Sequence, residues 1–198
     1  PCEGPSLVRC LDCATGHYGA FKGVPVTLGG LAGARALAAA VDRFVVVSEA
    51  VATGNGLADR GLPYQVIPNL WHPAPPSPNA VHAEHIRRLP AGDFILFVGD
   101  LSHDKGLTLL LDAYAGLPDP LPLVLIGRRC ADTPTDFPTG VRWLGIWPHG
   151  AVQEAWRAAT IAVAPPVWPE PFGLVALEAM AAGRALVATR TGGMADVV

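Results

Sequence analysis

Short apolar runs alternate with helix-forming segments along residues 94–190, and few folds accommodate such a pattern. The runs FILFVG, PLVLIG, VRWLG, IAVAP and ALVATR begin at residues 94, 122, 141, 161 and 185. Helices are expected near residues 105–117, 149–160 and 173–182. Strands that alternate with helices at this rhythm indicate βαβ units and a parallel sheet covered on both faces. We therefore predict an α/β fold.

A ligand site is expected in the loops that follow these strands. Parallel α/β sheets bind ligands at the carboxyl ends of their strands, where such loops gather. The segments GDLSHDKG, GRRCAD, GIWPHG and PPVWPEPFG begin at residues 99, 127, 145 and 165. We expect them to lie along one common edge of the sheet.

The first part of the chain has fewer strands. After an irregular start rich in Cys, Gly and Pro, helices are expected at 31–43 and about 49–60, with strands at 44–48 and 64–69. Residues 70–92 hold five prolines, which suits a linker. The expected parts are the carboxyl portion of one Rossmann-like domain (1–70), a linker (71–92) and a second Rossmann-like domain (93–198).

Charge and hydropathy exclude several classes of protein. The net charge is −3 and no basic block occurs, which argues against nucleic-acid partners and against a polybasic membrane patch. No apolar run is expected to approach the ~20 residues that span a bilayer. The chain begins with Pro1 and stops after GGMADVV, so we expect a fragment with a truncated second domain.

Two carboxylates bracket the apolar run in EPFGLVALEA, residues 170–179. A carboxylate is costly to bury without a partner, so Glu170 and Glu178 need one. Pro171 and Gly173 come just before a helix whose first amides form an anion site. Both carboxylates are expected to reach the same cleft and to bind paired hydroxyls. The alternative is a capping Glu followed by an exposed helix Glu.

The same residues carry a resemblance to a known family. Glu-x7-Glu in EPFGLVALEAMAAG resembles the motif of the family 4 retaining glycosyltransferases, which have the GT-B fold. FVGDLSHDKGLTLLLDAY is similar to that family's first strand, loop and helix after the linker. VVVSEAV and LADRGLPYQVIPN are similar to the end of its N-terminal domain, and ATRTGGMADVV to the stretch after the Glu-x7-Glu helix. The resemblance implies two Rossmann-like domains with parallel sheets, the first only partly present.

The resemblance also implies a role for each motif residue. Glu170 would contact hydroxyls of the transferred sugar, and Glu178 would bind those of the ribose. Lys105 would meet the diphosphate; the alternative is a solvated surface lysine. The backbone amides that approach the sugar and phosphates would be those of Phe172, Gly173 and Leu174. The residues expected beside the nucleotide base are Gly145 and Ile146, with Trp147 either stacking on it or packing in the core.

One position departs from the family pattern. The family commonly has Arg after the glycine of the first loop, and here that residue is Asp100. A carboxylate at this position would repel a diphosphate. Either Asp100 turns away from the donor, or Arg128 or Arg129 supplies the missing cation. A solvated loop is the alternative for the two arginines.

A cysteine pattern lies near the N-terminus. The spacing of Cys2, Cys10 and Cys13, with His17 shortly after, could hold a structural metal. Free cysteines or a local redox pair are the alternatives. No Asp-x-Asp motif is present, and we expect neither a catalytic metal nor a cofactor. TLGGLAGAR (27–35) lacks the preceding strand of a dinucleotide-binding loop.

The predicted activity is transfer of a sugar, with retention, from a UDP-, GDP- or ADP-linked donor to an acceptor glycan, lipid or small molecule. Front-face substitution is the expected mechanism. One alternative is a sugar-nucleotide-binding module that has lost activity, for which Asp100 is the argument. Another is a nicotinamide-dependent enzyme, which would need a glycine fingerprint that the strand at 94–99 lacks. The expected location is cytoplasmic, or peripheral at the inner face of the membrane through the N-terminal domain.

Overall fold

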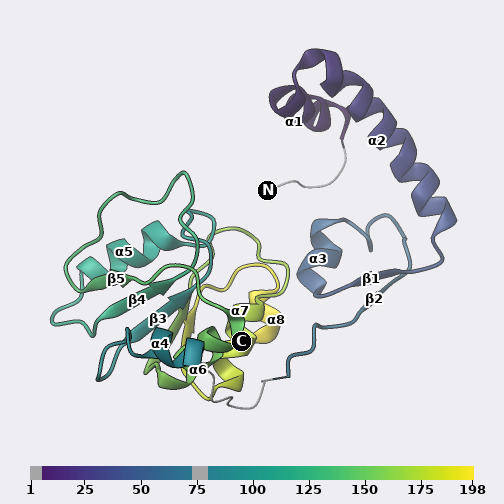
Figure 1. Ribbon diagram of the computed structural model, residues 1–198. Coiled ribbons are helices and arrows are strands. Elements are labelled where there is room, and N and C mark those ends of the chain that lie inside the picture. Colours follow the sequence, from purple (N-terminus) through teal and green to yellow (C-terminus); the bar gives the residue numbers. More distant parts are fainter. Residues whose placement is uncertain (1–5, 73–79) are drawn as a thin grey trace. The chain divides into compact units, whose positions relative to one another are not determined.

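The computed structural model describes residues 6–72 and 80–198. The chain divides into two compact units, Pro1–Pro68 and Asn69–Val198 (Figure 1). The elements of the first unit are α1 (Leu7–Tyr18), α2 (Ala20–Ala40), β1 (Phe44–Val46), α3 (Glu49–Gly54) and β2 (Tyr64–Val66). Both strands predicted for this part of the chain are confirmed, and they pair in parallel.

Helices α1 and α2 replace the irregular start that the sequence predicts. The Ser6 hydroxyl caps α1 by accepting a hydrogen bond from the Arg9 amide, and Gly19 turns the chain between the helices with a φ of 76°. Gly23 lets the two backbones meet, because a Cβ there would lie 2.6 Å from the Thr15 nitrogen. The glycines that argued for an irregular segment are therefore turn and packing residues, and TLGGLAGAR lies within α2.

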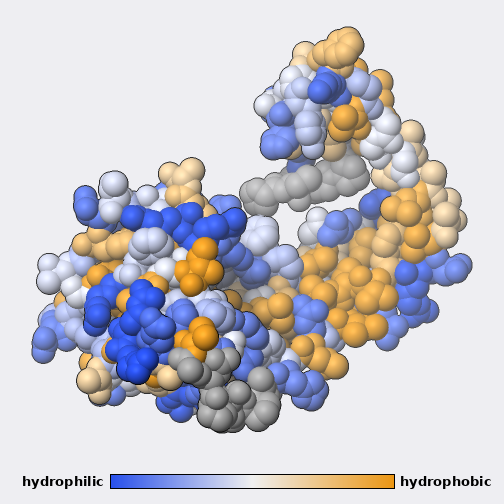
Figure 2. All heavy atoms as spheres, in the orientation of Figure 1, coloured by the Kyte–Doolittle hydropathy of each residue, from blue (hydrophilic) through white to orange (hydrophobic). Residues whose placement is uncertain are grey.

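Helix α2 bears on whether any apolar segment is long enough to span a bilayer. Its 21 residues are long and apolar enough to cross a bilayer by length and composition, and only 12% of its apolar window is buried. The expectation that no run approaches this length is wrong, because Lys22 and Pro25 interrupt the apolar sequence without ending the helix. Figure 2 shows apolar side chains on the surface of this unit. Phe21 of α2 is 93% exposed.

The second unit holds a five-stranded parallel sheet with the order β5-β4-β3-β6-β7. Its strands are β3 (Ile95–Val98), β4 (Leu123–Ile126), β5 (Val141–Trp143), β6 (Ile161–Ala164) and β7 (Ala185–Ala188). Its helices are α4 (Ala80–Ile86), α5 (Leu107–Ala115), α6 (His149–Ala158), α7 (Leu174–Ala181) and α8 (Met194–Val197). All five strands predicted here are confirmed, as are the three helices predicted between them.

Side chains alternate between the two faces of this sheet. Phe97, Leu123 and Leu125 pack with the leucines of α5 on one face. Leu96 and Val124 belong to the cluster on the other face, with residues of α6 and α7. Because both faces are covered, the strands read as continuous apolar runs in the sequence. That is why they could be predicted.

Part of the expected linker is helical. Within residues 71–92, Ala80–Ile86 forms α4, and Ile86 and Leu89 pack against the core of the second unit. Residues 73–79 lie outside the described residues. Prolines on both sides of this short helix gave the whole stretch the composition of a linker.

The strand order reverses between β3 and β6. From β3 the chain proceeds through β4 to β5 at one edge of the sheet, then crosses to β6 and β7 on the other side. Loops that follow strands on either side of such a reversal leave a crevice at the carboxyl edge, where α/β sheets bind ligands. The loops after β3 and β6 are therefore the first place to look for a site.

Candidate functional site

The loops after β3 and β6 are joined at the point where the strand order reverses. The Val167 amide donates to the Asp104 carbonyl at 3.0 Å. Gly106, with a φ of 78°, lies against the other loop so closely that a Cβ would be 1.7 Å from the Pro165 oxygen. A side chain cannot occupy this position, so Gly106 fixes both the start of α5 and the place of Lys105.

Lys105 and Glu170 meet across this junction. The lysine Nζ lies 2.6 Å from Glu170 Oε2, and the glutamate side chain is 17% exposed. The indole Nε1 of Trp168 donates to the same oxygen at 3.0 Å. Lys105 Nζ also lies 5.1 Å from the centre of the Trp168 ring. Two residues that the sequence singled out, 65 positions apart, are thus brought into direct contact, and Glu170 has structural partners without being a helix cap.

The backbone of Glu170 is held by the loop after β7. The Gly193 amide donates to the Glu170 carbonyl at 2.6 Å. A Cβ on Gly192 would lie 2.7 Å from the Glu170 nitrogen, so only glycine fits. The Thr189 hydroxyl donates to the Pro166 carbonyl at 2.6 Å. The segment ATRTGG therefore supports the loop that carries Glu170.

Helix α7 begins at Gly173, which has a φ of 90°. A Cβ at Gly173 would lie 2.1 Å from Met194 Sδ, so the turn is packed as well as left-handed. Phe172 is buried beside it, whereas Leu174 is exposed. The first amides of a helix have no intrahelical acceptor and attract anions. The position of these amides matches the expected anion site, while their contact with a ligand remains a prediction.

Glu178 lies further along α7 and faces α6. Its Oε2 accepts a hydrogen bond from Trp156 Nε1 at 3.2 Å. Burial raises the pKa of this carboxyl, and the Trp156 hydrogen bond and the charge of His149 counteract the rise in part. Beside it is a small hollow whose other lining residues are Trp71, Gln153, Trp156, Arg157 and Ala182. Glu170 and Glu178 thus have different partners, and their meeting in one cleft stays a prediction.

Asp100 and Arg128 form an exposed ion pair. They follow Gly99 and Gly127, the first residues after β3 and β4. These two glycines lie so close together that a Cβ on Gly127 would be 1.7 Å from the Gly99 oxygen. Arg128 Nη2 lies 2.6 Å from Asp100 Oδ2, and Nε lies 3.3 Å from Oδ1. This pairing raises the pKa of the Arg128 guanidinium through the hydrogen bond and charge of Asp100. The acid that departs from the family pattern is therefore neutralised by the arginine expected to compensate for it.

Arg129 has a different, structural environment. Its Nη2 donates to the carbonyls of Pro134 and Thr135. Its guanidinium lies 5.2 Å from the centre of the Phe137 ring and 5.1 Å from that of Trp143. Arg128 therefore pairs with a carboxylate, whereas Arg129 is held by backbone carbonyls and aromatic rings.

In the loop after β5, Ile146 is 70% exposed. Gly145 has a φ of 87°, and its carbonyl accepts from the Gly127 amide at 2.9 Å. Trp147 is buried, donates to the Leu144 carbonyl at 3.1 Å and contacts the His85 ring edge-on. Trp147 is therefore a packing residue, and it is not available to stack on a base.

The described N-terminal cysteines lie on α1. Cys10 and Cys13 are free, and His17 contacts Tyr18. Within residues 6–72 and 80–198, no group of three His, Cys, Asp or Glu side chains could hold a metal ion. Cys2 lies outside the described residues, so the four-residue site predicted from spacing stays a prediction.

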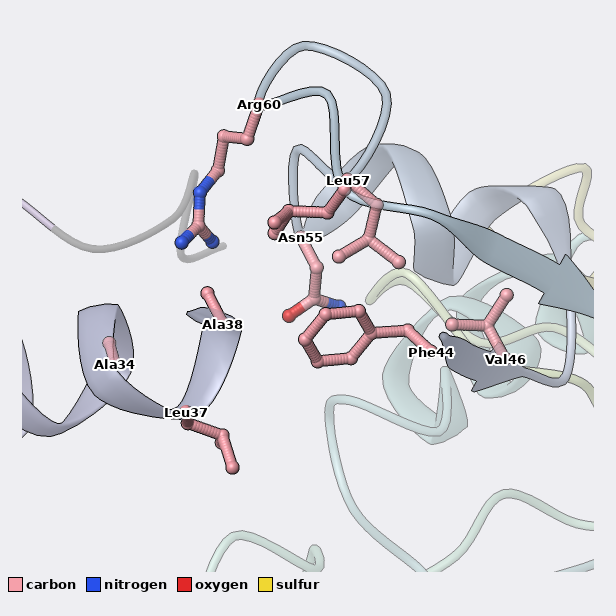
Figure 3. A pocket seen from close by; sticks show the side chains of 9 residues that line it. Ala34, Leu37, Ala38, Phe44, Val46, Asn55, Leu57 and Arg60 are labelled. Carbon is pink, nitrogen blue, oxygen red and sulfur yellow. The ribbon is translucent and has the colours of Figure 1, made fainter. Parts of the chain in front are cut away.

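A separate hollow of about 290 Å³ lies in the first unit. Figure 3 shows Phe44, Val46 and Leu57 on one side and the carboxyl half of α2 on the other. Asn55 and Arg60 add polar groups. None of the residues predicted to bind a donor lines it.

A family model described as "Glycosyl transferases group 1" matches residues 84–198. The chain belongs to this family. The matched residues contain Lys105, Glu170 and Glu178 and every strand of the second unit's sheet. The resemblance noted from the sequence is therefore confirmed.

Curated relatives match more than half of the chain. Alpha-maltose-1-phosphate synthase of Mycolicibacterium smegmatis is 33% identical over 147 residues, covering 65% of this chain and 36% of that protein. Phosphatidyl-myo-inositol mannosyltransferase of Mycobacterium leprae is 32% identical over 127 residues, covering 57% and 34%. The chain thus spans about a third of the length of these curated relatives.

Solved glycosyltransferases share the fold of this family member. Sucrose-phosphate synthase from Thermosynechococcus elongatus matches with a TM-score of 0.63 at 26% identity, over 80% of this chain and 43% of that one. Anabaena HepE, solved in complex with UDP-glucose, matches with a TM-score of 0.63 at 24% identity, over 80% and 47%. The expected fold class, α/β of the GT-B type with parallel sheets, is confirmed.

Sequence reasoning missed several residues that build the site. Trp168 and Trp156 hold the two glutamates, and Gly106 and Gly192 allow the loops to meet. Trp168 could have been found, because it stands two residues before Glu170 in an otherwise apolar and proline-rich loop. Trp156 could not, because its spacing within α6 is that of an ordinary core residue.

Proposed function

We propose that the second unit binds a nucleotide-diphosphate sugar at the carboxyl edge of its sheet, and that the protein transfers the sugar to an acceptor with retention. The observation that carries the proposal is the contact between Lys105 and Glu170. A cation and an acid meet at 2.6 Å where the strand order reverses, beside the starts of α5 and α7. Lys105 would serve as a partner for phosphate, next to Glu170 as a partner for hydroxyls.

The charges of the site suit a diphosphate donor. Lys105 and the first amides of α7 would offset the phosphate charges, and Arg128 would add a second cation once it leaves Asp100. Glu170 would accept hydrogen bonds from hydroxyls of the transferred sugar, and Glu178 from those of the ribose. Ile146 and the backbone of Gly145 offer an exposed surface for the base.

Retention would follow from attack on the face that the leaving group occupies. The departing phosphate oxygen would take the acceptor proton, while Lys105 and the helix amides stabilise the charge that develops on the diphosphate. Glu170 would orient the sugar and stabilise positive charge at its anomeric carbon. The acceptor, whether glycan, lipid or small molecule, would approach from the amino-terminal domain.

Calorimetric titration with UDP, GDP and ADP tests the proposal. One nucleotide should bind, and Lys105→Ala should weaken it about tenfold or more, because charge-assisted contacts to phosphate are lost. The only other lysine is Lys22 on α2, and Lys22→Ala provides a matched control that should leave binding unchanged. Equal effects of the two substitutions would contradict the proposal.

The Asp100–Arg128 pair favours a second candidate, a binding module without transferase activity. With Arg128 held by a carboxylate, the diphosphate would have one cation fewer than the family pattern provides. Hydrolysis of a nucleotide sugar in the absence of an acceptor separates the two functions. An active enzyme hydrolyses its donor slowly, whereas a binding module leaves it intact.

A cytoplasmic location fits the described cysteines. Cys10 and Cys13 lie one turn apart on α1 and remain unbonded, and Cys130 is free in the second unit. Unpaired thiols of this kind suit a reducing compartment. Peripheral membrane contact would involve the apolar surface of the first unit.

A further inference from the structure

We infer that Trp168 is a positioning residue of the donor site, which holds Glu170 and Lys105 in place through two different parts of its side chain. The inference rests on the proposed function. The indole N–H donates to Glu170 Oε2 at 3.0 Å, and the ring face lies 5.1 Å from Lys105 Nζ. One side chain thus contacts both charged groups that the donor would need.

The distribution of hydrogen bonds over Glu170 supports this role. Lys105 and Trp168 both donate to Oε2. Among the described residues, no hydrogen bond to Oε1 is present, which leaves that oxygen for a hydroxyl of the sugar. A carboxylate fixed at one oxygen presents the other in a defined direction, and such fixed geometry is what ligand orientation requires.

Trp168 matters most when a donor is bound. The phosphates would draw Lys105 away from Glu170, because the two anions compete for one cation. The indole N–H would then be the donor that still holds Oε2, so Glu170 keeps its orientation as its salt bridge opens. The ring contact would keep the ammonium group near the phosphates, since a cation is attracted to the face of an indole.

The test compares the affinities of a nucleotide sugar and its bare nucleotide. UDP-glucose and UDP form one pair, GDP-mannose and GDP the second, and ADP-glucose and ADP the third. Trp168→Phe keeps an aromatic face for Lys105 and removes the N–H. We expect it to lower the affinity for the nucleotide sugar about tenfold, while the affinity for the nucleotide stays within about twofold. Trp168→Leu, which removes the ring as well, should weaken both ligands.

Trp143 provides a matched control. It is 39% exposed against 38% for Trp168, donates through Nε1 to the Gly127 carbonyl at 2.9 Å, and has a cation 5.1 Å from its ring centre. Its contacts involve a backbone carbonyl and Arg129, and neither belongs to the sugar subsite. Trp143→Phe should therefore leave the difference between the two affinities unchanged.

A double-mutant cycle with Glu170→Ala, which removes the acceptor of the Trp168 N–H, gives a second readout. If Trp168 acts through Glu170, adding Trp168→Phe to Glu170→Ala should cost much less than it does alone. The inference would be overturned, and the proposed function left intact, if the losses were additive. The same holds if Trp168→Phe showed the same difference between nucleotide-sugar and nucleotide affinity as the wild type. A Trp168→Phe variant that weakens nucleotide and nucleotide sugar equally would also overturn it. Failure of the wild-type chain to bind any of the three nucleotide pairs would instead contradict the proposed function and the inference with it.

Discussion

Two ion pairs of described residues, Lys105–Glu170 and Arg128–Asp100, lie at the carboxyl edge of the second unit's sheet. The two pairs differ in exposure, which determines how readily each can open. Side-chain exposures in the Arg128–Asp100 pair are 65% and 42%, so solvent screens it and the pair contributes little to stability. The Lys105–Glu170 pair is less exposed, at 36% and 17%, and has Trp168 as a third partner. Phosphates should therefore displace Asp100 more easily than Glu170.

Neutralising Asp100 should free Arg128 for a diphosphate. Asp100→Asn removes a competing carboxylate, so the nucleotide diphosphate should bind several-fold more tightly at low salt, with a smaller gain at high salt. Asp104→Asn is the control, because it removes the same charge from the same exposed loop without touching Arg128. Calorimetry at two salt concentrations measures both. Equal tightening by Asp100→Asn and Asp104→Asn would assign the effect to net charge.

Replacing Glu178 with Gln should stabilise the protein at neutral pH but weaken donor binding. Burial raises its pKa above the usual 4.5, so the folded protein holds this proton more tightly than the unfolded chain. Stability is therefore lost as pH rises from the unfolded value through the folded one. Glu178→Gln can still accept from Trp156 Nε1, so it should melt higher than wild type at about pH 7.5 and about equally at about pH 4. On the proposed function, donor affinity should nevertheless fall about tenfold, because Glu178 would no longer offer the ribose a charge-assisted hydrogen bond.

Thermal melting at the two pH values, with calorimetry at the higher one, measures these effects. Unchanged donor affinity in a folded Glu178→Gln variant would remove Glu178 from the ribose subsite. A Glu178→Gln variant that melts lower than wild type at about pH 7.5 and about equally at about pH 4 would show that the pKa is lowered instead.

At the scale of the element, two helices of the site begin at left-handed glycines. Gly106 precedes α5 and Gly173 precedes α7, with φ values of 78° and 90°. Each glycine also lies in close contact with a neighbouring loop or helix, so two constraints act at one position. The direction of each helix start, and hence of its amides, depends on them.

Gly173→Ala should destabilise the protein more than a left-handed glycine alone explains. Gly183 has a φ of 73° and open space for 4 Å around the position that a Cβ would take, so Gly183→Ala should cost only the conformational penalty, about 1 kcal/mol. Gly173→Ala adds a clash with Met194 Sδ and should cost about 2 kcal/mol or more. Urea unfolding of both variants gives the difference. Equal losses would show that Met194 moves aside freely.

The sheet could be predicted from the sequence, because buried parallel strands are uninterrupted apolar runs. The contact between Lys105 and Glu170 could be anticipated only as two residues at one edge, since their distance depends on the packing of Gly106 on Pro165. The pairing of Asp100 with Arg128 depends in the same way on Gly99 and Gly127. Helices α1 and α4 were missed because their glycines, or the prolines around them, have the composition of loops.

At the scale of the molecule, the two units differ in how much they bury. The sheet of the second unit has five strands with an apolar cluster on each face. The described part of the first unit has two strands and one small cluster around Val46, Ala52 and Leu57. Two paired strands are marginal without further packing, so most of the stability should reside in the second unit.

Residues 69–198 should therefore fold alone and bind the nucleotide with the affinity of the whole chain. The 198-residue chain should self-associate, because Phe21, Val45 and Leu37 on the first unit are 93%, 62% and 58% exposed. Light scattering and urea unfolding of the two proteins test this. A monomeric 198-residue chain, or an unfolded 69–198 fragment, would contradict it.

The contact between Lys105 and Glu170 also bears on turnover. A ligand that needs Lys105 unpaired must bind the fraction of molecules in which this contact is open, so its affinity would be reduced by that fraction. On the proposed function, a complete donor offers Glu170 sugar hydroxyls when it takes the lysine, whereas the spent nucleotide offers none. The carboxylate would then reclaim its lysine after each transfer, so that the same 2.6 Å contact that opposes donor binding speeds release of the product.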